Sequence, residues 1–137
     1  MTKEIWLNLP VKDVQRSKAF FEAIGFIFNE PRSTGNDMAC MYAGEKKFVV
    51  MLIREAMFAG FSKNNLTDTS QSSEILISYD AESREEVDTI AKKVVTAGGT
   101  MFGEPGESQG WMYGCGFSDP DGHRWNVLYM DFSKVPK

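Results

Sequence analysis

Three side chains that could bind a ligand or take part in catalysis alternate near the C-terminal end of the chain, at Trp111, Tyr113 and Cys115. Residues two apart in a β-strand point to the same face, so we expect the three to share one face. One interpretation is packing against a helix. The other is a pocket wall, in which both aromatic rings stack on a flat or aliphatic ligand and the Tyr113 hydroxyl offers a hydrogen bond.

The few cysteine and histidine residues argue against thiol or zinc chemistry. No histidine or cation evident near Cys115 would form a thiolate, so Cys115 is not predicted to be a nucleophile. Cys40 and Cys115 are predicted to be reduced packing residues. Two thiols and one histidine do not supply the four ligands of a structural zinc site. His123 directly follows Gly122 in a predicted turn, and we favour a turn-stabilising or exposed histidine over a catalytic one.

The elements that position these side chains begin with a strand, a helix and three further strands. Asp13 is the predicted N-cap of the helix, and Gly25 ends it in a left-handed turn. Apolar runs and turn residues predict the strands at residues 4–11, 26–29, 38–42 and 47–54. We expect this βαβββ module to occupy residues 4–54.

The same order of elements recurs later in the chain. Ser83 and Glu86 predict a capping box, in which each side chain reaches the other's free backbone amide. The helix that follows has apolar residues at i, i+3, i+4 and i+7, namely Val87, Ile90, Ala91 and Val94. Strands are predicted at 74–80, from 100 to 102, and in a final hairpin at 111–118 and 124–131, with a loop at 104–109. The second module is expected to span 73–132.

The turn of the final hairpin has a strong local signature, Asp119-Pro120-Asp121-Gly122. Pro120 pre-sets the backbone angle at the second turn position, Asp119 can accept hydrogen bonds from turn amides, and Gly122 takes the final position. This pattern predicts a tight connection between the last two strands.

The two modules predict a single α+β domain over 1–137 with an internal duplication. Residues 55–72 are predicted to be a polar linker whose apolar side chains cover another surface or a ligand. We expect the helices to pack on one side of a curved mixed sheet, which leaves a concave cup on the other side. Pockets commonly form where repeated units meet.

Composition excludes several classes of protein. The net charge is −4 with acids and bases interspersed, so no basic stripe for nucleic acid is present, and Lys46-Lys47 and Lys92-Lys93 are predicted to be solvated. No apolar run approaches the ~20 residues that cross a membrane. The N-terminus lacks a secretion signal, so we expect a cytoplasmic protein. Eight methionines favour core filling over an adaptable ligand surface.

Two motifs at opposite ends of the chain resemble the vicinal-oxygen-chelate superfamily of glyoxalases, bleomycin-resistance proteins and extradiol dioxygenases. The first is Leu9-Pro10-Val11-Lys12-Asp13 with Ser17, Phe20, Phe21 and Gly25-Phe26, and the second is Asp119-Pro120-Asp121-Gly122-His123-Arg124-Trp125-Asn126-Val127. The resemblance covers roughly residues 5–131. It implies two tandem βαβββ modules around a cup, and it is nearest to glyoxalase-like members without a known substrate.

Metal-dependent members of this superfamily hold a divalent ion in the cup, where it polarises substrate oxygens as a Lewis acid. The resemblance places the matching ligand positions at Trp6, Met51, Glu74 and Asn126. Indole has no lone pair for a metal, thioether is a poor ligand for hard ions, and an amide oxygen binds them weakly. We therefore expect no cofactor; Glu74 and Asn126 would hold a divalent metal if one binds.

Two functions follow from the resemblance. The first, which we favour, is a metal-free protein that binds a small flat, hydrophobic or cationic molecule in an aromatic cup formed by Trp6, Met51, Trp111, Tyr113 and Asn126. The acidic balance of the chain would tolerate a cationic guest. The second is an enzyme (a lyase, isomerase or dioxygenase) that uses a rebuilt metal site or Glu74 as a catalytic general base. The resemblance also implies a homodimer, with no nucleic-acid or membrane partner.

Overall fold

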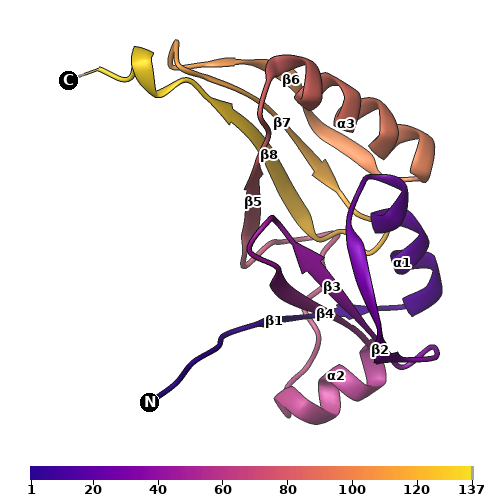
Figure 1. Cartoon of the computed structure of the whole chain (residues 1–137). Helices are drawn as coiled ribbons and strands as arrows, with labels where there is room; N and C mark the ends of the chain where they lie inside the picture. Colours follow the sequence, from indigo (N-terminus) through magenta and orange to yellow (C-terminus); the bar gives the residue numbers. More distant parts are fainter. Residues whose placement is uncertain (137) are drawn as a thin grey trace. The chain divides into compact units, whose positions relative to one another are not determined.

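The computed structural model describes residues 1–136, and it divides into two compact units, Met1–Asp68 and Thr69–Lys137. Each unit contains one four-stranded mixed sheet with the element order strand, helix and three strands (Figure 1). This repeated order confirms the predicted α+β fold of two βαβββ modules.

The first unit holds two helices and four strands. Their bounds are β1 Leu7–Val11, α1 Val14–Ala23, β2 Ile27–Thr34, β3 Met38–Ala43, β4 Phe48–Arg54 and α2 Glu55–Ser62. The strand order is β1-β4-β3-β2, with β1 parallel to β4 and the other pairs antiparallel. The β2 strand is therefore an edge strand, as is β1.

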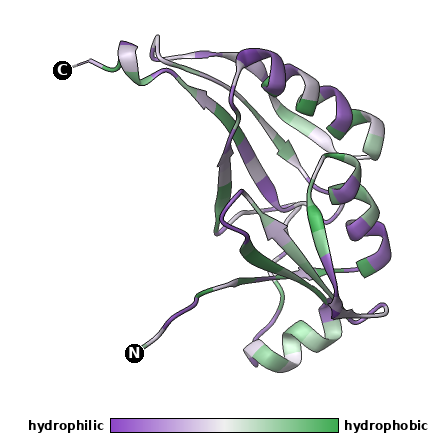
Figure 2. Cartoon of the chain, viewed as in Figure 1, coloured by the Kyte–Doolittle hydropathy of each residue, from purple (hydrophilic) through white to green (hydrophobic). Residues whose placement is uncertain are grey.

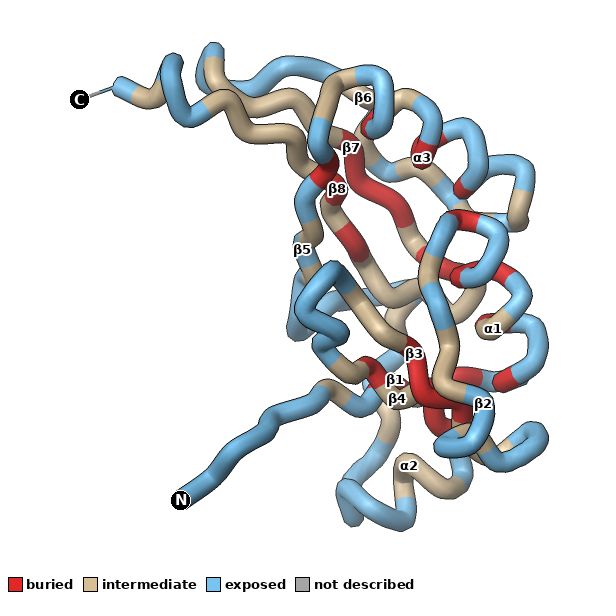
Figure 3. Tube along the Cα trace, in the orientation of Figure 1, coloured by how far each residue is buried: buried red, intermediate tan, exposed pale blue. Residues whose placement is uncertain are grey.

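Side chains alternate across this first sheet, and one face is packed against α1. Leu9, Leu52 and Ala39 lie opposite one another in the register and are fully buried, like Phe20 and Phe21 of α1 (Figure 3). The neighbouring positions point to the other face of the sheet, because successive residues of a strand alternate. That second face, which α1 does not cover, carries Asn8, Met51 and Cys40 in register.

The second unit repeats this arrangement with one long helix. Its elements are β5 Leu76–Asp80, α3 Arg84–Ala97, β6 Thr100–Ser108, β7 Met112–Ser118, β8 Arg124–Met130 and a 3-10 turn at Phe132–Lys134. The strand order is β5-β8-β7-β6. Apolar and polar residues alternate along α3 (Figure 2), and its buried side chains are those of the predicted stripe, Val87, Ile90, Ala91 and Val94.

The helix starts agree with the predicted caps in part. Asp13 Oδ1 accepts a hydrogen bond of 3.1 Å from the backbone N–H of Arg16, as expected for an N-cap. The Ser83 hydroxyl accepts one of 3.1 Å from the backbone N–H of Glu86. The return bond of the capping box differs from the prediction, because the Glu86 carboxylate accepts from the backbone N–H of Glu82 rather than from that of Ser83.

Two segments differ from their predicted form. The predicted linker 55–72 begins with a helix, α2, because Glu55–Ser62 is rich in helix-forming and apolar residues; α2 contacts β1 and β4. The predicted loop 104–109 lies largely within β6, which pairs with β7 through two register shifts. Such bulges allow a glycine-rich strand to keep pairing where a regular alternation is lost. Across residues 1–136, no helix has the length and apolar character that spanning a membrane requires.

Candidate ligand-binding site

A hollow of about 800 Å³ lies on the face of the first sheet that α1 does not cover. We call it the first-sheet hollow; it is lined by Lys3, Glu4, Ile5, Trp6, Asn8, Arg32, Met38, Lys46, Lys47, Phe48, Val49, Met51, Ile53 and Phe61. Five of its strand residues share one face because they alternate with the buried core positions, namely Asn8, Met38, Val49, Met51 and Ile53. Two of the predicted site residues, Trp6 and Met51, are thus brought to the same hollow.

Aromatic side chains are exposed around the first-sheet hollow. Trp6, Phe48 and Phe61 are 55%, 43% and 65% exposed, respectively. Large apolar side chains in water lose the hydrophobic stabilisation that burial provides, and a cluster of them commonly marks a binding surface. Met38 and Met51 add flexible thioether side chains that adapt to the shape of a guest. Phe61 belongs to the segment 55–72, whose apolar side chains were predicted to cover another surface or a ligand, whereas Phe48 was not predicted to be part of a site.

The charged lining of the first-sheet hollow is mainly basic. It consists of four cations and one acid, namely Lys3, Arg32, Lys46, Lys47 and Glu4. The first unit has nine basic and eight acidic residues, so the net charge of −4 derives from the second unit. The expectation that a cationic guest would be tolerated rested on the charge of the whole chain, whereas the charged side chains of this hollow are mainly basic. Lys46 and Lys47, predicted to be merely solvated, belong to its lining.

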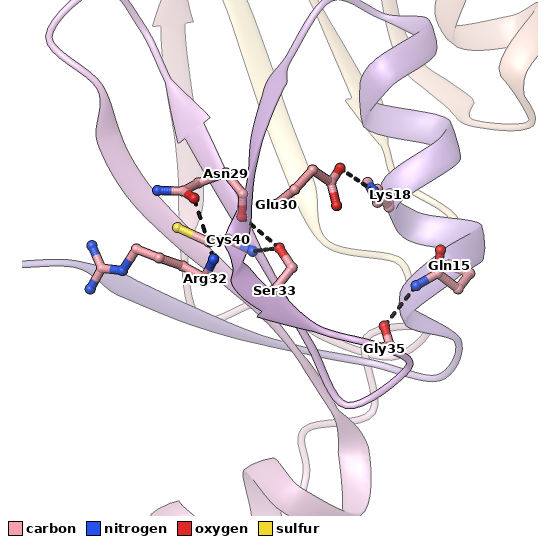
Figure 4. Close-up of polar contacts among 8 residues, drawn as sticks. All are labelled: Gln15, Lys18, Asn29, Glu30, Arg32, Ser33, Gly35 and Cys40. Carbon is pink, nitrogen blue, oxygen red and sulfur yellow. Dashed lines mark hydrogen bonds and ion pairs between the residues drawn. The ribbon is translucent and has the colours of Figure 1, made fainter.

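A bulge in β2 gives Arg32 its direction. The pairing of β2 with β3 shifts register between Asn29 and Thr34. Asn29 Oδ1 accepts a hydrogen bond of 3.3 Å from the backbone N–H of Arg32, and the Ser33 hydroxyl donates one of 2.9 Å to the Asn29 carbonyl oxygen. Figure 4 shows the Arg32 side chain extending away from Lys18, whereas Glu30 extends toward Lys18 and forms an ion pair with it. Bulges commonly re-aim a side chain in this way.

The bulge is tied to the neighbouring strand β3. The Ser33 hydroxyl accepts a hydrogen bond of 3.1 Å from the backbone N–H of Cys40, and the Asn29 side-chain amide donates one of 2.7 Å to the Tyr42 hydroxyl. Burial raises the pKa of the Cys40 thiol, and the positive charge of Arg32 opposes that shift. The Arg32 charge therefore acts on the hollow face of the sheet.

In the second unit, Tyr113 lies on the α3 side of its sheet. Its hydroxyl donates a hydrogen bond of 2.7 Å to Asp88 of α3, which raises the pKa of Tyr113. The Arg84 guanidinium carbon lies 5.0 Å from the centre of the Tyr113 ring. These contacts agree with the packing interpretation of Tyr113, and its role as a pocket wall stays a prediction. Tyr113 makes these contacts because β7 directs its odd-numbered residues toward the helix, as the buried Cys115 and Phe117 show.

The other predicted site residues of the second unit occupy different positions. Trp111 precedes β7, and its ring centre lies 6.2 Å from that of Phe132. Glu74 precedes β5 and is exposed. Asn126 of β8 is half-buried and lies in register with Ser78 and Gly116, on the face opposite to buried Trp125 and Val127. Their convergence with Trp6 and Met51 of the first unit stays a prediction.

The β7–β8 turn is organised by a buried carboxylate, Asp119. Its Oδ1 accepts hydrogen bonds from the backbone N–H groups of Asp121 at 2.9 Å and His123 at 3.1 Å, and its Oδ2 accepts one of 3.1 Å from the Trp125 indole. Burial raises the pKa of Asp119, and the charge of His123 together with these donors opposes that increase. His123 is thus part of the turn, as predicted.

The donor chemistry does not fit a divalent metal at the expected positions. Of Trp6, Met51, Glu74 and Asn126, only Glu74 carries a strong ligand for hard cations. Within residues 1–136, no group of three or more His, Cys, Asp and Glu side chains is arranged to hold a metal ion.

Comparisons with known proteins agree with this architecture. A sequence profile described as bleomycin resistance protein-like N-terminal matches residues 3–44. The structure of hypothetical protein SA1046 from S. aureus is 36% identical, with a TM-score of 0.83, and the match covers 94% of both chains. No curated protein matches the chain.

Two further structures share the fold at low sequence identity. A glyoxalase-related enzyme from Fulvimarina pelagi has a TM-score of 0.79 at 17% identity, covering 94% of this chain and 88% of that one. A glyoxalase/bleomycin resistance protein/dioxygenase family enzyme from Burkholderia phytofirmans has a TM-score of 0.77 at 16% identity. The match covers 91% of this chain and 96% of that one. The fold is thus the glyoxalase/bleomycin-resistance fold of two repeated modules, as predicted. The chain belongs to the same family as hypothetical protein SA1046, and its residues 3–44 are similar to the bleomycin resistance protein-like N-terminal family.

Proposed function

We propose that this protein binds a small, largely apolar molecule in the first-sheet hollow and that binding requires no metal. The observation that carries the proposal is the gathering of three exposed aromatic side chains, Trp6, Phe48 and Phe61, around one hollow. A guest that covers these rings would remove apolar surface from water, which contributes roughly 25 cal/mol per Å² before the costs of binding.

The size and lining of the first-sheet hollow support a small-molecule ligand. Its volume of about 800 Å³ lies within the range of roughly 300–1,000 Å³ that is usual for small-molecule pockets. Such pockets combine an apolar wall with a few polar groups that orient the ligand. Here the apolar wall includes Met38, Val49 and Met51, and Asn8 contributes an amide.

The proposal that binding requires no metal rests on the types of side chain that line the first-sheet hollow. An ion needs several oxygen, nitrogen or thiolate ligands, whereas Trp6 and Met51 bring an indole and a thioether to the first-sheet hollow. Both groups favour contact with an apolar or aromatic guest instead.

A neutral aromatic probe tests the proposal directly. Biphenyl-4-carboxamide should shift the indole N–H resonance of Trp6 in solution NMR and raise the melting temperature, because a bound guest stabilises the folded state. EDTA should change neither effect. The W6A variant should lose most of the affinity, whereas F132A, which removes an exposed aromatic side chain of the second unit, should not.

Two results would contradict the proposal. One is a Trp6 resonance that stays unchanged across a panel of flat aromatic compounds, including charged ones. The other is stoichiometric divalent metal in the purified protein that is lost in E74A, which would favour the enzyme alternative. We also propose a homodimer, as expected for the family; a monomer mass in sedimentation at micromolar concentration would contradict it.

A further inference from the structure

We infer that the ligand carries an anionic oxygen group, such as a carboxylate, which Arg32 binds while the apolar body of the ligand covers Trp6. This inference deepens the proposed function and rests on it. The inference rests on the mainly basic lining of the first-sheet hollow. The lining contains four basic residues, Lys3, Arg32, Lys46 and Lys47, and one acidic residue, Glu4. Such a cluster of one sign attracts an oppositely charged ligand.

Arg32 is positioned to bind a ligand rather than to form an ion pair with an acidic side chain of the same protein. Within residues 1–136, no acidic side chain forms an ion pair with it. Two other arginines differ: Arg54 pairs with Asp37 at 3.0 Å, and Arg84 pairs with Glu107. Arg32 instead has its backbone N–H held by the Asn29 side chain, which fixes the start of the side chain at the bulge.

A second cation is linked to the same side chains. The Lys47 ammonium lies 5.5 Å from the centre of the Tyr42 ring, and the Tyr42 hydroxyl accepts from the Asn29 amide, which also orients Arg32. Lys47 itself adopts a left-handed backbone conformation (φ 57°). Arg32 and Lys47 are therefore both tied to the Asn29–Tyr42 pair at the β2–β3 side of the sheet.

The chemistry of guanidinium favours a planar oxyanion. Arginine presents several N–H donors in a rigid fork that matches a carboxylate with two parallel hydrogen bonds. Apolar neighbours such as Met38 strengthen this attraction because they lower the local dielectric constant.

The sheet also indicates the length of the ligand. Trp6 precedes β1, and Arg32 lies on β2, at opposite edges of the four-stranded sheet. Neighbouring strands are about 4.8 Å apart, so these edges are separated by roughly 14 Å. A ligand that reaches both residues is elongated, with its charge at one end.

A matched series of biphenyl compounds provides the test. Biphenyl-4-carboxylate, biphenyl-4-carboxamide and biphenyl-4-ylmethylammonium share one body and carry charges of about −1, 0 and +1 at pH 7. We expect the carboxylate to bind about tenfold more tightly than the carboxamide and the ammonium compound to bind most weakly, as measured by calorimetry together with the Trp6 indole resonance. Added salt should weaken binding of the carboxylate alone.

Variants at position 32 assign the effect to one side chain. R32Q should reduce the affinity for the carboxylate about tenfold, to near that for the carboxamide, and should lower the affinity for the carboxamide much less. R124Q is the matched control, because Arg124 lies over Phe102 in the second unit and does not line the hollow; its affinities should equal those of the wild type. N29A should lower carboxylate binding selectively, since it releases the bulge that directs Arg32.

The outcomes separate the two proposals. Equal affinities for all three compounds, or unchanged carboxylate binding in R32Q, would overturn the anionic ligand while leaving the small-molecule site intact. Absence of any Trp6 response to the whole series would overturn the proposed function itself. Unchanged melting temperatures of R32Q and R124Q would show that lost affinity does not come from unfolding.

Discussion

The Thr69 hydroxyl donates a hydrogen bond of 2.6 Å to the backbone carbonyl oxygen of Asp121, 52 residues further along the chain. This contact fastens the beginning of the second unit to the β7–β8 turn. The next residue of the turn, Gly122, has φ +86°, and a Cβ placed on it would lie 2.4 Å from Thr69 Oγ1. Thr69 therefore occupies space that only a glycine leaves free.

Replacing Gly122 should reveal this close approach. G122A should lower the free energy of unfolding by more than G44A, because Gly44 has a similar φ of +78° but no neighbouring atom within 4 Å of an added Cβ. G44A isolates the backbone cost, about 1–2 kcal/mol. The additional loss of stability in G122A measures the cost of the clash with Thr69. Urea denaturation of the two variants gives both free energies. In the T69A/G122A double variant, part of that loss should be recovered; equal losses in G44A and G122A would contradict the prediction.

Removing the Asp119 carboxylate should destabilise the second unit. D119A leaves two backbone N–H groups and the Trp125 indole without their acceptor, and Asp119 is only 5% exposed. We expect a loss of about 3 kcal/mol in the free energy of unfolding, because buried donors without partners are costly. D119N, which keeps one carbonyl oxygen, should lose less. A loss in D119A no larger than that of D80A, at an exposed strand position, would refute this prediction.

Cys115 should be unreactive in the folded protein. It is 6% exposed, and burial raises its pKa to about 11. At pH 8 the thiolate fraction is then about one in a thousand, compared with about one quarter for a free cysteine. In C40A, which leaves Cys115 as the single thiol, modification by 5,5′-dithiobis(2-nitrobenzoate) should be at least about a hundredfold slower than that of glutathione. Rapid modification of folded C40A would disprove this.

The same pKa shift makes stability depend on alkaline pH. The unfolded thiol ionises near pH 9.0, whereas the folded one keeps its proton until about pH 11. Rising pH through this window therefore favours the unfolded state, so the stability of the folded state decreases. The wild type should lose more stability between pH 9 and pH 11 than C115A in parallel denaturation series; identical slopes would contradict the shift.

Two glycines of β7 should respond differently to alanine. A Cβ at Gly114 would lie 2.6 Å from the carbonyl oxygen of Val127, which the sheet holds in place. A Cβ at Gly116 would meet the Phe102 ring at 2.4 Å, and that ring is an exposed side chain rather than backbone. G114A should therefore lose about 1–3 kcal/mol of stability, and G116A less, as measured by urea denaturation. A larger loss in G116A would show that the Phe102 ring is fixed.

Local sequence patterns determined most of the secondary structure. Asp13 and Ser83 mark the starts of α1 and α3, and the apolar spacing in α3 fixes its buried face. The Asp119-Pro120-Asp121-Gly122 turn was predictable because each residue acts on its immediate neighbours. The register shifts of β6 were not predictable, because they depend on the partner strand β7.

The candidate site depended on contacts between distant residues. Tyr113 has a type and spacing suited to a pocket wall, yet its hydroxyl bonds to Asp88 of α3, which no local pattern reveals. Arg32 lies in an unremarkable polar segment, and only the pairing of β2 with β3 directs it to the first-sheet hollow. The sequence by itself determined the two modules and their family, because caps, turns and periodicity act over a few residues. Only the tertiary structure decided which face of each sheet stays open, since that depends on where the helices pack.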